Sequence, residues 1–453
     1  MENKNDFLGK EKIGKLLFKL AVPTIAAQII NMLYNIVDRI YIGHISQIGD
    51  LALTGVGVCL PVIMIVSAFA ALVSSGGGPR ASIFMGKRDY SEAEKILGSC
   101  FSFQIIVSLL LTVVLFFFSE KMLLYFGASE NTIDYAVSYM KIYSLGTIFV
   151  QLTLGMNAFI TAQGATKTSM LTVLIGAVLN IILDPIFIYG FNMGVEGAAL
   201  ATIISQAISC LWVLLFLSGK KSILVLKRKN LRPNIKTIVP CVALGLAPFI
   251  MQSSESVISL CFNSSLLKFG GDIAVGAMTI LTSVMQFAML PLQGLAQGAQ
   301  PILSYNYGAK KQLRLKKTFK LLIVSSLVYS ISLWAMIMLF PSFFAGIFTN
   351  KEELISFTAT ALRIYCAVLL IFGIQIACQM TFISLGNAKA SITVAVVRKF
   401  VLLLPLIYIM PLLIENKTLA VYSAEPVADI VAVSFTAVLF SFQFKKALKS
   451  IES

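Results

Sequence analysis

The sequence predicts an all-α integral membrane protein with twelve transmembrane helices, arranged as two six-helix lobes related by a pseudo-twofold axis along the membrane normal. The composition is strongly apolar, the apolar residues form runs long enough to cross a bilayer, and the second half of the chain repeats the first. Of the 453 residues, 58% are hydrophobic and 13% are charged, whereas soluble domains carry about 25% charged residues. The mean hydropathy is +0.88, which leaves little chain for a soluble domain.

The length of the apolar runs predicts the individual helices. A helix needs about 20 apolar residues to cross the hydrocarbon core of a bilayer. Runs of this length recur along the whole chain, separated by short polar connections. The expected helices cover residues 16–42, 51–78, 94–119, 131–160, 168–190, 195–218, 236–266, 273–303, 318–340, 353–384, 391–414 and 418–444.

The basic residues predict the orientation of these helices. Lys and Arg concentrate in alternate connections, for example at Lys87 and Arg88 and again at 227–229. Connections rich in Lys and Arg stay in the cytoplasm, so both termini are expected there and the chain is expected in the cell membrane. This distribution accounts for the formal net charge of +15 and argues against nucleic acid as a partner.

A repeat at an offset of 222 residues predicts that the two halves share one fold. The motif that begins at Gly49 recurs at Gly271, and Gly86 recurs as Gly308. Six helices per half is an even number, so both halves enter the membrane from the same side and alternating access by rocking of two lobes is expected. The predicted bounds are 1–218 for the N-terminal lobe, 219–236 for a cytoplasmic linker and 237–453 for the C-terminal lobe.

Polar residues inside the N-terminal apolar runs predict an ion site. Asp38 and Asp184 lie in spans where a carboxylate costs roughly 2.5–3.5 kcal/mol. Asn180 precedes Asp184 by one helical turn and shares its face, and Thr202 lies at a similar depth in the next span. Carboxylate, amide and hydroxyl oxygens are hard ligands that suit Na⁺ or a shared proton. The alternative is that Asp38 only caps its helix beside Arg39.

Further polar, aromatic and sulfur-containing residues predict a binding site for substrate or for a second cation. Glu255 lies near mid-membrane in the C-terminal half, where it could bind a cation or pair with Arg363 or Arg398. Tyr139 could stack on a cation. Methionine side chains adapt to ligands of varied shape, so Met285 and Met289 could line a substrate pocket. Methionine side chains also commonly face lipid.

Several classes of function are disfavoured by what the sequence lacks. No GxxxxGK[ST] loop is present, so ATP is not expected to drive the protein. The single histidine, His44, lies in an outer connection, and the seven cysteines contain no CxxC pair. We therefore expect no enzyme activity and no cofactor apart from a coupling ion, H⁺ or Na⁺. A channel would lack this coupling, and current recordings would distinguish it.

Three motifs resemble those of the multidrug and toxic compound extrusion (MATE) family, most closely its MepA-like group near the DinF branch. They are Asn180 to Pro185 in the fifth span, Gly194 to Ala199 at the start of the sixth, and Gln297 to Pro301 with Tyr307 to Lys310 at the end of the eighth. The resemblance covers essentially the whole chain and implies a V-shaped fold of two lobes.

The resemblance also implies a function. It implies a monomeric antiporter that exports lipophilic, often cationic drugs in exchange for H⁺ or Na⁺, with Asp38, Asp184, Asn180, Thr202 and Tyr139 in the N-terminal lobe. Glu255 matches a helix 7 glutamate of the NorM branch, but the tenth span lacks that branch's aspartate. The alternative within the superfamily is a flippase for lipid-linked sugars or another metabolite. Those proteins usually have 14 spans, so the twelve spans expected here disfavour this alternative.

A major-facilitator transporter is disfavoured because the connection between the second and third spans lacks the GxxxD motif of that family.

Overall fold

The computed structural model describes residues 6–46 and 48–452, and every regular element in this part of the chain is a helix. Ten of the described helices are long and apolar enough to cross a membrane. Eleven spans result when one bent pair of helices is counted as a single span. The predicted all-helical membrane fold is therefore confirmed. The predicted lobe bounds also take in residues 1–5, 47 and 453, which lie outside the described part.

The N-terminal lobe contains six long helices preceded by a short one. Its elements are α1 (Phe7–Lys10), α2 (Ile13–Gly43), α3 (Gly49–Gly86), α4 (Tyr90–Tyr125), α5 (Ile133–Ala162), α6 (Thr166–Pro185), the π-helical η2 (Ile186–Gly190) and α7 (Gly194–Ser218). A connection with one 3₁₀ turn, η3 (Arg228–Asn230), leads to the C-terminal lobe.

The C-terminal lobe is more interrupted than the sequence predicts. Its elements are α8 (Ile235–Gly308), α9 (Gln312–Leu339), α10 (Pro341–Gly346), α11 (Glu352–Tyr365), α12 (Leu369–Ser384), α13 (Ala388–Val396), the π-helical η4 (Val397–Leu403), α14 (Leu404–Leu413) and α15 (Lys417–Glu452). The single helix predicted for 353–384 is broken into α11 and α12, which are bent by 51° at the break.

Helix α8 accounts for two of the predicted spans. It is 74 residues long, far more than a bilayer requires. Gly271 interrupts it with a backbone φ of 64° and ψ of −161°, a conformation open in practice only to glycine. The two parts of α8 therefore correspond to the spans predicted at 236–266 and 273–303.

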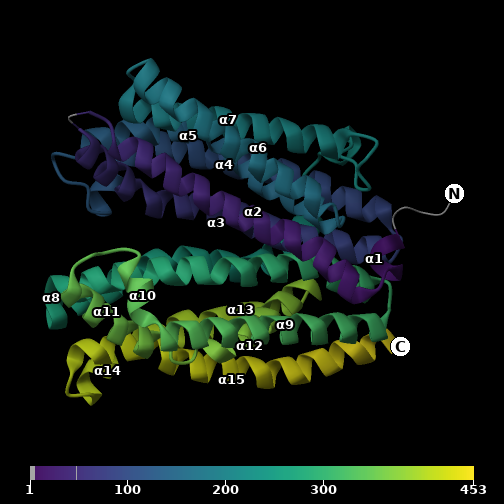
Figure 1. Cartoon of the computed structure of the whole chain (residues 1–453). Coiled ribbons are helices and arrows are strands. Elements are labelled where there is room, and N and C mark those ends of the chain that lie inside the picture. The colour runs from purple at the N-terminus through teal and green to yellow at the C-terminus, as the bar shows by residue number, and fades with distance from the viewer. Residues whose placement is uncertain (1–5, 47, 453) are drawn as a thin grey trace.

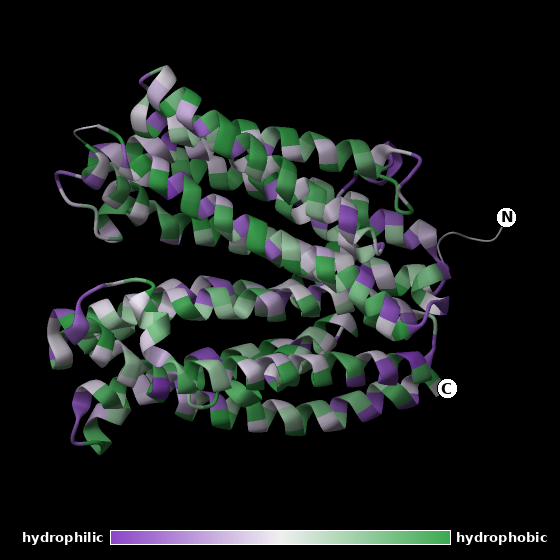
Figure 2. Ribbon diagram, in the orientation of Figure 1, coloured by the Kyte–Doolittle hydropathy of each residue, from purple (hydrophilic) through white to green (hydrophobic). Residues whose placement is uncertain are grey.

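The two lobes lie side by side, and both ends of the described chain lie at the same end of the molecule, which we call the termini end (Figure 1). Near the termini end the ribbons of the lobes converge (Figure 1). Hydrophobic residues recur along the helices of both lobes (Figure 2). Large apolar side chains such as Phe117 and Phe442 are 73% and 71% exposed, as expected where hydrocarbon rather than water surrounds the protein.

A symmetric glycine contact joins the lobes at the termini end. Gly86 of α3 packs against the backbone carbonyl of Tyr305 in α8, and Gly308 of α8 packs against the carbonyl of Ile83 in α3. Residues 83 and 86 differ from 305 and 308 by the same 222 positions as the sequence repeat. A side chain at either glycine would overlap the opposite backbone. The repeat in the sequence thus appears in the structure as a pseudo-twofold contact.

Hydrogen bonds between the lobes lie in the same region. The hydroxyl of Thr24 in α2 donates to the carbonyl of Gly294 in α8 at 2.6 Å. The amide of Gln28 donates to Gln297 at 3.0 Å. Thr24 lies in the first half of α2 and Gln28 at its midpoint, and Asp38 lies beyond them, toward the end of the helix at Gly43.

Candidate ion and substrate site

The four residues predicted to form the ion site come together in the N-terminal lobe. Asp38 projects from α2, Asn180 and Asp184 from α6, and Thr202 from α7. Asp184 is fully buried and Asn180 is 2% exposed, while Asp38 and Thr202 are half-buried. Three helices that are separate in the sequence therefore supply one polar cluster.

Asn180 holds the cluster together through its side-chain amide. Its Nδ2 atom donates to Oδ1 of Asp184 at 3.1 Å and to Oγ1 of Thr202 at 3.4 Å. The first bond joins two residues on one face of α6, as their spacing of four residues predicts. The second bond ties α6 to α7. The Asn180 amide thus orients the Asp184 carboxyl group.

Asp38 and Asp184 face each other across the space between α2 and α6. Their carboxyl groups lie within hydrogen-bonding reach of each other. Asp38 does not cap its helix, because α2 continues beyond it to Gly43. Oδ1 of Asp38, Oδ2 of Asp184 and Oδ1 of Asn180 are buried without a hydrogen-bond partner. Unpaired buried oxygens are costly, and two facing carboxylates repel each other more strongly as the effective dielectric falls.

Aromatic side chains border this cluster. Tyr139 of α5 is 4% exposed, and its phenol lies within hydrogen-bonding reach of Thr202 and in the electrostatic field of Asp38. Tyr143 stacks on Tyr139 with ring centroids 6.2 Å apart and planes 14° apart. Tyr34 of α2 also lies in the field of Asp38. Tyr139 therefore belongs to the N-terminal cluster and is separate from Glu255.

The backbone of α6 changes where it carries Asp184. Pro185 ends the α-helical part, and η2 continues as a π-helix. Proline lacks the N–H that would bond to an earlier carbonyl, and π-helical turns are frequent at functional sites. Local sequence thus places a wider helical turn directly after the buried acid.

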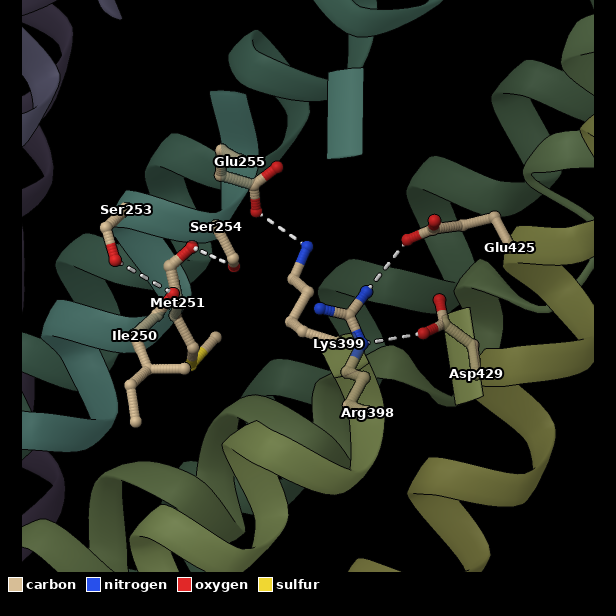
Figure 3. A network of polar contacts seen from close by, with 9 residues as sticks. All are labelled: Ile250, Met251, Ser253, Ser254, Glu255, Arg398, Lys399, Glu425 and Asp429. Carbon is tan, nitrogen blue, oxygen red and sulfur yellow. Dashed lines mark hydrogen bonds and ion pairs between the residues drawn. The ribbon is translucent and has the colours of Figure 1, made fainter. Parts of the chain in front are cut away.

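Glu255 belongs to a separate charged network in the C-terminal lobe (Figure 3). Its carboxylate pairs with Lys399 of η4 at 2.7 Å. The neighbouring Arg398 pairs with Glu425 at 3.0 Å and with Asp429 at 2.8 Å, both on α15. The network thus joins three carboxyl groups to two cations.

This network corrects one expectation from the sequence. Glu255 pairs with Lys399, and not with Arg363 or Arg398. Arg363 instead donates to the carbonyl of Met338 at 3.3 Å. Both Arg398 and Lys399 are buried in the widened turn of η4, at 6% and 4% exposure. Arg398 is occupied by the two acids of α15, which leaves Lys399 for Glu255.

Met285 and Met289 lie in the C-terminal lobe and not beside the N-terminal acids. Both are half-buried against the apolar core of that lobe. The sulfur of Met285 lies 3.6 Å from the thiol of Cys366. The residues that the sequence groups as a substrate site are thus divided, with Tyr139 in one lobe and Glu255, Met285 and Met289 in the other.

Two contributors to these networks were not predicted from the sequence. Lys399 is one, although two adjacent cations inside an apolar run are a signal that buried acids lie nearby. Tyr34 is the other, and it precedes Asp38 by one turn of α2. The spacing of four residues could have identified Tyr34.

Comparison with known sequences shows the family of the chain. The MatE family model matches twice, at residues 23–186 and 248–409, once in each lobe. "Multidrug export protein MepA" of Staphylococcus haemolyticus (strain JCSC1435) is 25% identical over 404 residues, which are 89% of this chain and 88% of that protein. The protein of the same name from Staphylococcus aureus (strain NCTC 8325 / PS 47) is 26% identical over the same lengths.

Comparison with solved structures indicates the same family. A structure of the MATE multidrug transporter DinF-BH in complex with a ligand matches with a TM-score of 0.90 and 33% identity, and the match covers 99% of both chains. An outward-facing MATE family transporter of the MOP superfamily matches with a TM-score of 0.91 at 22% identity, again over 99% of both chains. With two copies of the family model and a relative of this identity, the chain belongs to the MATE family of membrane transporters.

Proposed function

We propose that this protein is a secondary active antiporter that exports lipophilic, cationic compounds across the cell membrane in exchange for H⁺ or Na⁺. Membership of a transporter family supports transport rather than catalysis. The names of the relatives, multidrug export protein and multidrug transporter, support drugs as the substrate class. We further propose that the protein works as a monomer in the plasma membrane, with the termini end in the cytoplasm.

The observation that carries the proposal is the pair of facing acids, Asp38 and Asp184, with their unpaired buried oxygens. Two carboxylates in a region of low dielectric do not both ionise unless a cation lies between them. A proton shared by the pair satisfies both oxygens. A Na⁺ ion would use the same oxygens with those of Asn180 and Thr202. Either ion lowers the negative charge of the site, and its departure raises that charge again.

The cycle that we propose links this ion to substrate. When the ion leaves, the N-terminal lobe gains negative charge, and a cationic substrate then binds more favourably. Tyr139 would contact the substrate in the N-terminal lobe, while Met285, Met289 and the half-exposed Glu255 would contact it from the C-terminal lobe. Rocking of the lobes would break the contacts at the termini end and expose the sites to the cytoplasm.

Dye transport by reconstituted protein tests the proposal. Proteoliposomes would be loaded with a fluorescent cationic dye and given either a pH gradient or a sodium gradient of equal size. Export driven by one gradient and not by the other identifies the coupling ion. A rate of dye export that does not depend on either gradient, or a unitary current in bilayer recordings, would contradict an antiporter. Transfer of a labelled lipid-linked sugar in the absence of dye export would favour the flippase alternative.

A further inference from the structure

A basic pocket lies between the two lobes at the termini end. Its volume is about 470 Å³, and both lobes line it. Lys87 and Arg88 come from the connection between α3 and α4, and Lys310 and Lys311 come from the connection between α8 and α9. The proposed exchange of ion and substrate makes no use of this pocket.

The two connections that form the pocket have the same backbone structure. Arg88 and Lys310, which are 222 residues apart, have positive φ values of 63° and 56°, which is uncommon for residues other than glycine. In each connection the backbone N–H of this residue donates three residues back, to Met85 at 2.9 Å and to Tyr307 at 3.1 Å. The pseudo-twofold axis therefore brings one cation from each lobe to equivalent places around a single pocket.

The cations in this pocket form no close ion pair in the described part of the chain, although Asp6 interacts electrostatically with Arg88. None of the four forms an ion pair within the described residues. The Lys311 ammonium donates to the carbonyl of Gly9 at 2.8 Å, and Lys87 lies over the ring of Phe84 at 4.9 Å. Both contacts leave the positive charge uncompensated.

Among the described residues that line the pocket, Asp6 is the one acid, and it already has partners. It accepts a hydrogen bond from the Tyr305 hydroxyl at 2.9 Å and pairs with Lys10 at 3.4 Å. The hydrogen bond from Tyr305 lowers the pKa of Asp6, so the carboxylate is ionised at neutral pH. The described lining thus has four cations and one carboxylate, an excess of three positive charges.

We propose that this pocket binds a phosphate group, either as free inorganic phosphate or as the headgroup of an anionic phospholipid. Arg and Lys are the side chains that proteins use to bind phosphate oxygens. The preference for basic residues on the cytoplasmic side explains why the connections are basic. It does not explain why cations from both lobes converge on one cavity. Because both lobes supply ligands, a bound phosphate favours the arrangement in which the lobes are joined at this end.

Binding to purified protein tests the inference without transport, so its outcome is independent of the proposed antiport. Calorimetry in detergent would measure inorganic phosphate binding against chloride at equal ionic strength. Arg88→Gln with Lys310→Gln should weaken phosphate binding by about tenfold or more, because each change removes a charged ligand. The matched control, Lys445→Gln with Lys446→Gln, removes two exposed cations of α15 near the same end of the molecule and should bind as the wild type does.

A second arm distinguishes the sources of the phosphate group. Native mass spectrometry would count lipids that remain bound after release from nanodiscs of phosphatidylglycerol or of phosphatidylcholine. Retention of phosphatidylglycerol that is lost only in the Arg88 and Lys310 variant assigns the pocket to a lipid headgroup. The inference is overturned if neither phosphate nor phosphatidylglycerol binds in preference to its control. It is also overturned if the α15 variant loses binding equally.

Discussion

The carboxyl groups of Asp38 and Asp184 lie within hydrogen-bonding reach of each other, although α2 and α6 carry them separately. Each leaves one buried oxygen without a partner. Repulsion between two carboxylates grows as the effective dielectric falls, so the pair favours a bound proton or cation. In the proposed cycle, loss of that ion would change the charge of the N-terminal lobe and would give the lobe two states with different affinities for a cationic substrate.

Replacing either acid should uncouple transport from the ion. Asp38→Asn or Asp184→Asn should lower gradient-driven dye export by about tenfold or more, within the range expected for a coupling free energy. Dye fluorescence in proteoliposomes measures the effect. Asp50→Asn is the control, because Asp50 is exposed at the start of α3. Export by both variants at the wild-type rate would remove these residues from the proposed role.

Loss of the Asn180 amide should alter the pH dependence of export. Asn180→Leu removes the donor to Asp184, and a hydrogen bond to a charged group is worth about 1.5–3 kcal/mol. The ionised acid is then less favoured, so the pH profile of export should move to higher pH. Thr202→Val should have a smaller effect, because the bond from Asn180 to Thr202 is long at 3.4 Å. Identical profiles for Asn180→Leu and wild type would contradict this account.

The two cations of η4 should differ in their effect on stability. Arg398→Gln leaves Glu425 and Asp429 buried without a partner, a change that costs about 3–5 kcal/mol. Lys399→Gln should cost less, because the side chain of Glu255 is 49% exposed. Thermal unfolding in detergent measures both. Adding Glu425→Gln and Asp429→Asn to Arg398→Gln should restore part of the loss. No restoration would mean that the arginine acts through packing on Phe372.

The glycine contact between the lobes should tolerate no side chain. Gly308→Ala places a methyl group against the carbonyl of Ile83, so the lobes should fail to join at the termini end. Dye export should fall, and Cys241, which is buried where α8 packs on Gly76, should react faster with a maleimide. The control is Gly57→Ala on α3, where the added carbon meets nothing within 4 Å. Because alanine has a higher helix propensity than glycine, a loss of export in Gly308→Ala but not in Gly57→Ala would reflect the contact between the lobes.

The bond between Asp6 and Tyr305 should stabilise the protein only when Asp6 is ionised. The hydrogen bond from Tyr305 lowers the pKa of Asp6 below its ordinary value of 3.8. The contribution is therefore present above that value and is lost as the pH falls through the lowered pKa. Asp6→Asn should lower the unfolding temperature in detergent near neutral pH and have little effect at a pH below the lowered pKa of Asp6. An equal loss at both pH values would assign the effect to packing.

The sequence predicts the parts of this molecule that depend on hydrophobicity and repetition. Apolar runs predict where the helices lie, and the match between Gly86 and Gly308 indicates from the sequence alone that the two halves are related. The acids of the N-terminal lobe are recognisable because a carboxylate in an apolar span is costly. The partner of Glu255 is not predictable, because the choice between Lys399 and Arg398 depends on how η4 turns and on the two acids of α15. The break between α11 and α12 also carries no proline or glycine signal.

Measurement of the ion released when dye binds to purified protein tests the central claim most directly. A pH indicator and a sodium electrode would follow wild type, Asp38→Asn and Asp184→Asn during dye titration in weakly buffered detergent solution. The account predicts release of H⁺ or Na⁺ from wild type in proportion to the dye bound, and little or no release from either variant. Dye binding by wild type without release of either ion, or equal release from all three proteins, would contradict it.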